Sequence, residues 1–251
     1  MICHDGGVPD PTRIKICGIT GLDDAELAVD AGAWAVGLIL WPGSPRACEL
    51  DQAELIARTL KRRAEVCGVF VNAPLDEVTG HVDALGLTMV QLHGEEGPAY
   101  CDEVRRRTGA LIVKAARVGG GADVQALEPF HTDFHLLDTF HENLRGGTGE
   151  TWDWELIQRR RSKVPLIMSG GLTQENVAHA IRTVRPFAVD TASGTESTPG
   201  RKDPEKLAAF VAAVEAENAA FAAEVAAARE AKALAKAEAA AARAAAEEAV
   251  S

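Results

Sequence analysis

Two side chains that can exchange protons stand near the ends of short apolar runs in this sequence. Cys17 lies in the run Ile14–Ile19 and is followed by Gly18, and Asp138 lies in the run Phe134–Thr139. An ionised carboxylate is costly to bury in apolar surroundings. Asp138 is therefore expected either to cap the next loop or to stay partly protonated and act as an acid. Cys17 is either a small buried hydrophobe or a reactive thiol at the rim of a site.

Two glycine-bearing segments point to an anion. One reads Ser169-Gly170-Gly171-Leu172 and the other reads Ala192-Ser193-Gly194-Thr195. Glycine lets backbone N–H groups approach an anion closely, and a short helix N-terminus adds a favourable dipole. A single Gly-Gly pair is usually a turn, but two such segments after consecutive strands predict a phosphate site.

These residues lie in a chain that repeats one unit, in which a strand is followed by a loop and then by a helix. The strand-like runs are Ile14–Ile19, Ala35–Leu40, Glu65–Val71, Met89–His93, Leu111–Ala116, Phe134–Thr139, Pro165–Ser169 and Phe187–Asp190. The helical stretches between them include Asp23–Ala31, Asp51–Arg62, Leu75–Leu85, Pro98–Arg107, Trp152–Arg160 and Gln174–Val184. Asp or Thr residues near several helix starts predict side-chain caps. Continuous apolar strands indicate a parallel sheet that is buried on both faces.

Eight such units predict a closed (βα)8 TIM barrel, an α/β fold with a single domain. An open doubly wound sheet is the structural alternative. It usually carries a Gly-rich fingerprint after its first strand, whereas this chain has Cys17-Gly18-Ile19-Thr20 there. In a barrel the catalytic groups come from the C-terminal ends of the strands. Those positions hold Cys17, Arg46, His93 and Asp138, together with the two glycine-bearing segments.

The two ends of the chain differ from this pattern. We expect an irregular leader over residues 1–13, the barrel over residues 14–217 and a tail over residues 218–251. A helix should begin after Asp203-Pro204, because Phe210, Val214, Phe221 and Val225 fall on one helical face. Residues 226–251 are rich in Ala, Glu and Lys and lack an apolar stripe, so we interpret them as a frayed helical extension. A partner-binding helix is the other interpretation.

Composition narrows the possible partners and the compartment. The formal net charge of −11 disfavours nucleic acid and anionic membranes as partners. Five scattered cysteines show no zinc-ligand spacing, which indicates a reducing compartment and predicts no metal site. The N-terminus lacks the apolar region of a secretory signal, and no apolar run is long enough to span a membrane. We therefore expect a soluble cytoplasmic protein.

Eight short motifs in order resemble the signature of the phosphoribosylanthranilate isomerases, a family of tryptophan biosynthesis. The motifs are Lys15-Ile16-Cys17-Gly18-Ile19, Ser44-Pro45-Arg46, Val69-Phe70-Val71-Asn72, Gln91-Leu92-His93-Gly94, Leu137-Asp138-Thr139, Gly146-Gly147-Thr148-Gly149, Ser169-Gly170-Gly171-Leu172 and Ser193-Gly194. They extend from Lys15 to the last barrel unit. Each motif is weak alone, but eight in the right order are highly specific.

The resemblance implies a cofactor-free aldose–ketose isomerase that carries out an Amadori rearrangement of N-(5′-phosphoribosyl)anthranilate. By similarity, Asp138 would be the general acid and Cys17 the general base. Arg46 would pair with the anthranilate carboxylate, and His93 would line the pocket. The backbone at Gly170, Gly171, Ser193 and Gly194 would hold the phosphate.

The sequence departs from the family pattern at Ala192, where a hydroxyl side chain is expected, and in its Ala-rich tail. The alternatives are another phosphate-binding barrel of the tryptophan or histidine pathways and a non-catalytic barrel that binds a phosphorylated ligand. The sequence leaves open whether the protein is a monomer or a homodimer.

Overall fold

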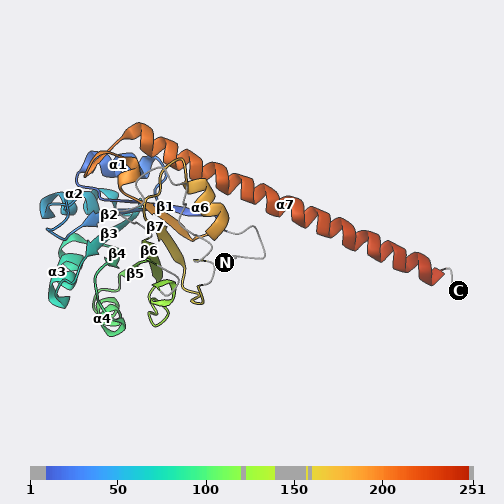
Figure 1. Ribbon diagram of the computed structural model, residues 1–251, viewed down its shortest axis with the longest axis horizontal. Coiled ribbons are helices and arrows are strands. Elements are labelled where there is room, and N and C mark those ends of the chain that lie inside the picture. Colours follow the sequence, from blue (N-terminus) through green and yellow to red (C-terminus); the bar gives the residue numbers. More distant parts are fainter. Residues whose placement is uncertain (1–9, 120–122, 139–156, 158–159, 249–251) are drawn as a thin grey trace.

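The fold is a closed barrel of parallel strands surrounded by helices (Figure 1). The computed structural model describes residues 10–119, 123–138, 157 and 160–248. Eight strands pair in chain order, and β8 pairs with β1 to close the barrel. The strands are β1 Arg13–Cys17, β2 Ala35–Ile39, β3 Glu65–Phe70, β4 Met89–Leu92, β5 Leu111–Arg117, β6 Phe134–Asp138, β7 Leu166–Ser169 and β8 Ala188–Thr191. The predicted TIM barrel is confirmed.

The helices lie outside the barrel, and a small hairpin follows β8. The α-helices are α1 Leu22–Asp30, α2 Leu50–Leu60, α3 Leu75–Leu85, α4 Pro98–Thr108, α6 Val177–Val184 and α7 Pro204–Glu248. The shorter elements are the 3-10 helices η1 Asp123–Gln125 and η3 Ser193–Thr195 and the antiparallel pair β9 Glu196–Thr198 and β10 Arg201–Lys202. The helix expected at Trp152–Arg160 lies almost wholly outside the described residues.

The prediction that side chains cap the barrel helices was wrong for α1 to α4. None of these four helices has a side-chain hydrogen bond at its N-cap. Asp23, Asp51 and Asp76 instead lie inside the first turns. There a carboxylate stabilises the helix through the dipole rather than by accepting a capping bond. At α7 the expected cap does form, because Asp203 Oδ1 accepts the amides of Glu205 at 3.0 Å and Lys206 at 3.1 Å.

The helix expected from Gln174 begins three positions later, at Val177. Asn176 Oδ1 accepts the amide of Thr173 at 2.9 Å, so the preceding residues form a turn. Asn and Asp favour such local bonds over helix.

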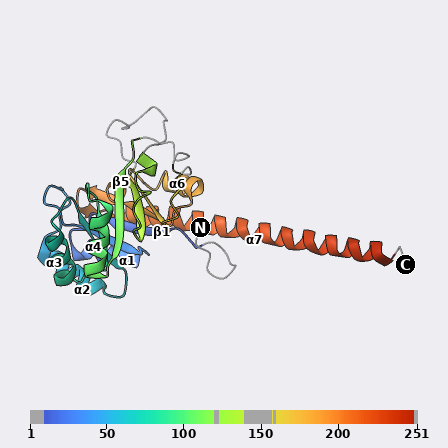
Figure 2. The same cartoon turned by 90° about the horizontal axis from the view of Figure 1, so that it is seen from below.

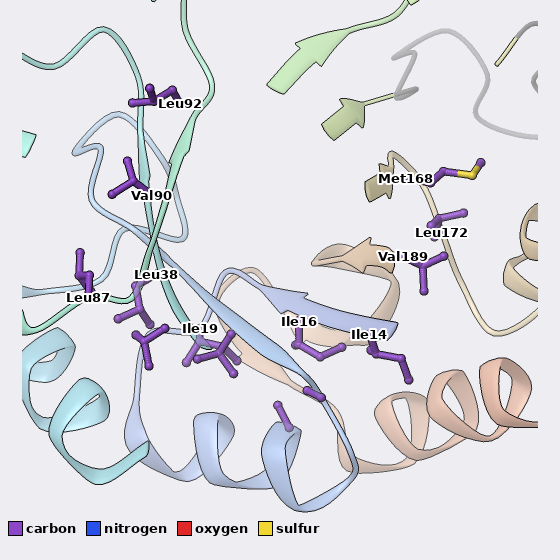
Figure 3. Packing of buried hydrophobic residues seen from close by; sticks show 14 of the residues in the cluster. Ile14, Ile16, Ile19, Leu38, Leu87, Val90, Leu92, Met168, Leu172 and Val189 are labelled. Atoms are coloured by element: carbon purple, nitrogen blue, oxygen red, sulfur yellow. The ribbon is translucent and has the colours of Figure 1, made fainter. Parts of the chain in front are cut away.

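Alternate residues of each strand serve two different cores. The layer between the strands and the helices contains Ile14, Ile16, Leu38, Val90 and Leu92 (Figure 3). Val36 belongs to the same cluster. Cys67, Val69, Met89, Val113, Leu136 and Ile167 belong to a second cluster inside the barrel. Successive side chains of a strand point to opposite faces, so Cys17 falls on the inner face with this second cluster.

Aromatic side chains close the N-terminal end of the barrel. The rings of Trp34, Phe134 and Phe187 pack against one another with centroids 4.9 to 5.5 Å apart. The Arg13 guanidinium lies 4.8 Å from the centroid of Phe187. These rings therefore fill the interior of the barrel near the N-terminal ends of β2, β6 and β8.

Helix α7 packs on the barrel with its first turns and then extends away from it (Figures 1 and 2). Phe210 and Val214 are fully buried. Asn218 exchanges two hydrogen bonds of 2.9 Å with the Thr12 backbone, and the Arg185 guanidinium lies 3.7 Å from the Phe221 ring centroid. Contacts with the barrel therefore continue past residue 217, and the helix is unbroken at the expected start of the tail. Within the described residues, no helix is both apolar and long enough for a membrane span.

Truncation after Val225 should leave Tm and kcat/KM nearly unchanged. The described side chains beyond this residue are exposed, Leu234 among them at 61%. The matched control on the same helix is Phe210→Ala, which should cost about 3–5 kcal/mol of stability. Thermal unfolding of both variants checks the expectation. A fall of several degrees in the truncated chain would show that the tail packs or mediates assembly.

Candidate active site

Cys17 ends β1 on the inner face of the barrel and is 7% exposed. Burial raises the pKa of its thiol above the ordinary value. The Lys15 and Lys202 ammonium groups act in the opposite direction, whereas Asp190 adds to the rise. A thiol in this environment gives up its proton only where cations support the thiolate.

A buried ion pair lies beside Cys17 inside the barrel. Lys15 Nζ is 2.9 Å from Asp190 Oδ1, and Ser169 Oγ donates to Asp190 Oδ2 at 3.1 Å. Burial alone would lower the pKa of Lys15, but Asp190 and the thiols of Cys17 and Cys67 raise it above its ordinary value. The Asp190 carboxylate at 2.9 Å thus favours the charged form of Lys15. Lys15 and Asp190 were not among the predicted site residues, although burying a charge is as costly for them as for Asp138.

Asp138 and His93 approach each other at the C-terminal ends of β6 and β4. His93 Nε2 lies 3.5 Å from Asp138 Oδ2, and both side chains are about one-fifth exposed (20% and 22%). The Gln91 side-chain amide lies 3.0 Å from His93 Nδ1. If Gln91 donates there, the imidazole proton is on Nε2 and faces Asp138. His93 therefore contacts Asp138 as well as lining the barrel mouth.

Arg46 lies beside the end of β1 and is already paired. Its Nε donates to Glu196 Oε1 at 2.9 Å, and its Nη2 donates to Glu196 Oε2 at 2.8 Å. A Cβ at Gly18, whose φ is +73°, would lie 2.8 Å from Cδ of Arg46, so glycine there makes room for the arginine. The hydrogen bond to Glu196 raises the pKa of Arg46. The Nε and Nη2 edge of the guanidinium thus binds Glu196, and Nη1 makes no hydrogen bond to it.

Lys202 joins β1 to the segment after β8. Its Nζ donates to Cys17 O at 2.7 Å, Ala192 O at 3.1 Å and Glu196 Oε1 at 3.3 Å. Burial by itself raises the pKa of Glu196. Arg46 and Lys202 together lower it by more than burial raises it, so the pKa of this carboxyl group lies below its ordinary value. Glu196 and Lys202 thereby hold Arg46 and the end of β1 in place. Neither residue was among the predicted site residues, because nothing in the sequence of a short polar hairpin indicates burial.

The two glycine-bearing segments meet at the ends of β7 and β8. Gly170 and Gly171 have φ values of +101° and +63°, which side-chain-bearing residues rarely adopt. Thr191 Oγ1 donates to Leu172 O at 2.8 Å, which ties the two segments together. A Cβ at Gly194 would collide with the backbone of Leu172. The four predicted residues Gly170, Gly171, Ser193 and Gly194 are therefore neighbours, whereas the motif Gly146–Gly149 lies outside the described residues.

A second buried ion pair holds the segment that follows β4, and a cavity lies apart from it. Lys114 Nζ bonds Glu96 Oε2 at 2.8 Å and Gly94 O at 2.6 Å. The cavity lies at the N-terminal end of the strands and includes Pro165, Phe187 and Phe221 in its lining. Neither holds a predicted site residue. Among the described residues, no group of three or more His, Cys, Asp or Glu side chains could hold a metal ion.

A closed barrel with a thiol, a carboxylate, a guanidinium and a paired glycine segment at one mouth is the architecture of a TIM-barrel enzyme. The family model for N-(5'phosphoribosyl)anthranilate (PRA) isomerase matches residues 14–213. The chain is 46% identical over 201 residues to the N-(5'-phosphoribosyl)anthranilate isomerase of Citrifermentans bemidjiense, covering 80% of this chain and 96% of that relative. The chain belongs to the PRA isomerase family.

Solved structures of this family have the same fold. One contains monomers of the dimeric isomerase from Thermotoga maritima, with a TM-score of 0.72, 38% identity and coverage of 82% of this chain and 99% of that one. Another is a PRA isomerase in complex with reduced 1-(o-carboxyphenylamino)-1-deoxyribulose 5-phosphate. Its TM-score is 0.72 at 38% identity, and the match covers 82% of this chain and 99% of that one.

Proposed function

We propose that this protein isomerises PRA to 1-(o-carboxyphenylamino)-1-deoxyribulose 5-phosphate by an Amadori rearrangement. Family membership supports the reaction, and the complex of a relative with the reduced product supports the ligand. The observation that carries the proposal is the placement of Cys17 and Asp138 at the C-terminal ends of β1 and β6. β7 and β8 separate these two strands in the closed strand order, so a ligand that lies over the barrel mouth between them would meet a thiol and a carboxyl group.

The chemistry requires one acid and one base. Asp138 donates a proton to the furanose ring oxygen, the C1′–O bond breaks, and the substrate nitrogen supplies the electron pair that forms an iminium. Cys17, as thiolate, then removes the C2′ proton, and the electron pair moves toward the nitrogen to give an enolamine. Tautomerisation of the enolamine gives the ketone. The substrate's own nitrogen is the electron sink, so the steps need no cofactor.

The remaining residues bind the ends of the substrate. The backbone amides at Gly170, Gly171, Ser193 and Gly194 would surround the phosphate, and the neighbouring strand ends support this arrangement. Arg46 would meet the anthranilate carboxylate through its Nη1 edge, while Glu196 holds the other edge. His93, 3.5 Å from Asp138, would keep the acid oriented.

Replacing Arg46 with alanine should raise KM by about 10- to 100-fold, the value of a lost charge-assisted hydrogen bond. Arg46→Lys should restore only part of the affinity, because a lysine cannot bind Glu196 and the substrate with two fixed edges. Steady-state kinetics at saturating and limiting PRA separate KM from kcat. Full rescue by lysine would show that a point charge is enough and would refute the two-edge model.

The test of the function is the loss of fluorescence of freshly made PRA on addition of the purified chain. Steady conversion to the deoxyribulose product, identified by mass and chromatography, is the expected result. Binding of the reduced product without conversion of PRA would instead show a phospholigand-binding barrel. The proposed compartment is the cytoplasm, because scattered cysteines are typical of a reducing compartment and a phosphorylated substrate must be used in the compartment where it is made.

Both a monomer and a homodimer are compatible with the described residues, and a T. maritima relative has been studied as a dimer and as derived monomers. Light scattering of the full chain and of the chain truncated after Val225 would assign the assembly and the contribution of α7.

A further inference from the structure

Gly37 brings a buried lysine and the Cys17 thiol to the same point inside the barrel. A Cβ at position 37 would lie 2.7 Å from Sγ of Cys17 and 3.2 Å from Nζ of Lys15. Gly37 pairs with Cys17 in the β1–β2 register. The ammonium and the thiol therefore both border the space that a side chain at position 37 would occupy.

The Lys15–Asp190 pair is expensive to bury, so it needs a reason beyond stability. Lys15 is fully buried and Asp190 is 5% exposed. Buried ion pairs often contribute little or nothing compared with apolar side chains of similar volume. The barrel interior around them is apolar, with Cys67, Val113 and Ile167 in the same cluster. In these apolar surroundings the electrostatic interaction between a cation and a nearby negative charge is stronger than it is in water.

Several charged or titratable groups face Cys17 from the surrounding elements. Lys15 comes from its own strand, Asp190 from β8, and Cys67 from β3. Lys202 comes from β10, with its Nζ on the Cys17 carbonyl, and Arg46 comes from the segment after β2. Lys202 and Arg46 both bond Glu196, which neutralises part of their charge. Lys15 is the cation that shares the Gly37 space with Sγ.

We propose that Lys15 and Asp190 form a positioning pair for the Cys17 thiolate, in which Lys15 supplies the stabilising cation and Asp190 fixes its place. Ser169 bonds the second oxygen of Asp190, so β1, β7 and β8 jointly set the position of the ammonium group. The proposal rests on the assignment of Cys17 as the base. It adds that the neighbouring strands determine how readily this base loses its proton.

The test measures the titration of Cys17 directly in the substrate-free full chain. The rate of Cys17 alkylation by iodoacetamide is followed against pH, with the Cys17 peptide quantified by mass spectrometry. Lys15→Met should move the alkylation midpoint upward by about one to two pH units, because a cation near the thiolate is lost. Asp190→Asn should move it downward, because the thiolate replaces the carboxylate as the partner of Lys15. The pH at which kcat/KM rises should shift in the same direction as the alkylation midpoint in each variant.

The matched control is Lys114→Met, which also removes a buried lysine from an ion pair, here with Glu96. It should leave the Cys17 midpoint in place even if stability falls. If Lys15→Met does not fold, Asp190→Asn decides the matter, since it retains the lysine. A Cys17 midpoint that stays at the wild-type pH in Lys15→Met, or that fails to fall in Asp190→Asn, overturns the proposal. Failure of the proposed function would appear differently, as a wild-type chain that does not convert PRA while the two titration shifts persist.

Discussion

Cys17→Ala should lower kcat by about 10²–10⁴-fold, the contribution of a general base in proton abstraction. The side chain ends β1 on the inner face, and its loss removes one sulfur from a site whose backbone is held independently by Lys202. KM should change little, because the phosphate and carboxylate contacts are assigned to other residues. Steady-state kinetics with PRA measure both constants.

Cys67→Ala is the matched control for this variant. Cys67 is also a thiol buried inside the barrel, and burial raises its pKa to about 12. It lies within β3 rather than at the strand end, so its removal should leave kcat close to wild type. Equal losses in the two variants would mean that a packing defect, rather than a missing base, explains the Cys17 result.

The pH dependence of kcat/KM should identify the same residue. Burial raises the pKa of the Cys17 thiol above its ordinary value, so the thiolate is the minor form at neutral pH. The value of kcat/KM should therefore rise with pH until the thiol is fully deprotonated. Cys17→Ala should abolish this rise. A profile that already reaches its plateau below neutral pH would be inconsistent with a thiolate base in this environment.

Asp138→Asn should also lower kcat by about 10²–10⁴-fold, because an amide cannot deliver the proton that opens the furanose ring. Asparagine has nearly the same shape and keeps an oxygen for His93, so folding and product-analogue binding should survive. Stopped assays with PRA measure the loss, and calorimetry with the reduced product measures binding.

A second carboxylate on the same strand region provides the comparison. Asp133 lies just before β6, where its Oδ2 accepts the Ile112 amide at 2.8 Å and the Arg105 guanidinium at 3.1 Å. Asp133→Asn should reduce stability modestly and leave kcat near wild type. If Asp138→Asn retained comparable activity, the acid would have to be another group, and His93 would be the first candidate because of its contact with Asp138.

Much of this architecture could be predicted from the sequence because it depends on local patterns. Continuous apolar runs predicted the ends of the strands to within about two residues. Cys17 and Asp138 could be predicted as site residues because they are reactive side chains near the ends of such runs. Lys15 carries the same signal inside its strand, and Asp190 carries it at the end of the predicted run Phe187–Asp190. Their pairing could not be predicted, because it depends on the closure of β8 against β1, which no local pattern shows.

The contacts of Arg46 could not be predicted in this way. Glu196 is 150 positions away in the chain, and it reaches Arg46 only because β8 closes against β1. The side-chain caps of α1 to α4 were mispredicted for a different reason. An acidic residue near a helix start can act through the dipole or through a cap, and the local sequence does not distinguish the two.

The most direct test of the acid–base assignment is single-turnover conversion of PRA by Cys17→Ala, with protein in excess over substrate. Excess protein removes substrate affinity and product release from the observed rate, so the decay of PRA fluorescence reports the chemical steps. A decay slower than wild type by at least about 10²-fold, with full binding of the reduced product, is the result expected if Cys17 is the base. A decay at the wild-type rate would contradict it and would leave Cys17 as a small core side chain at the end of a strand.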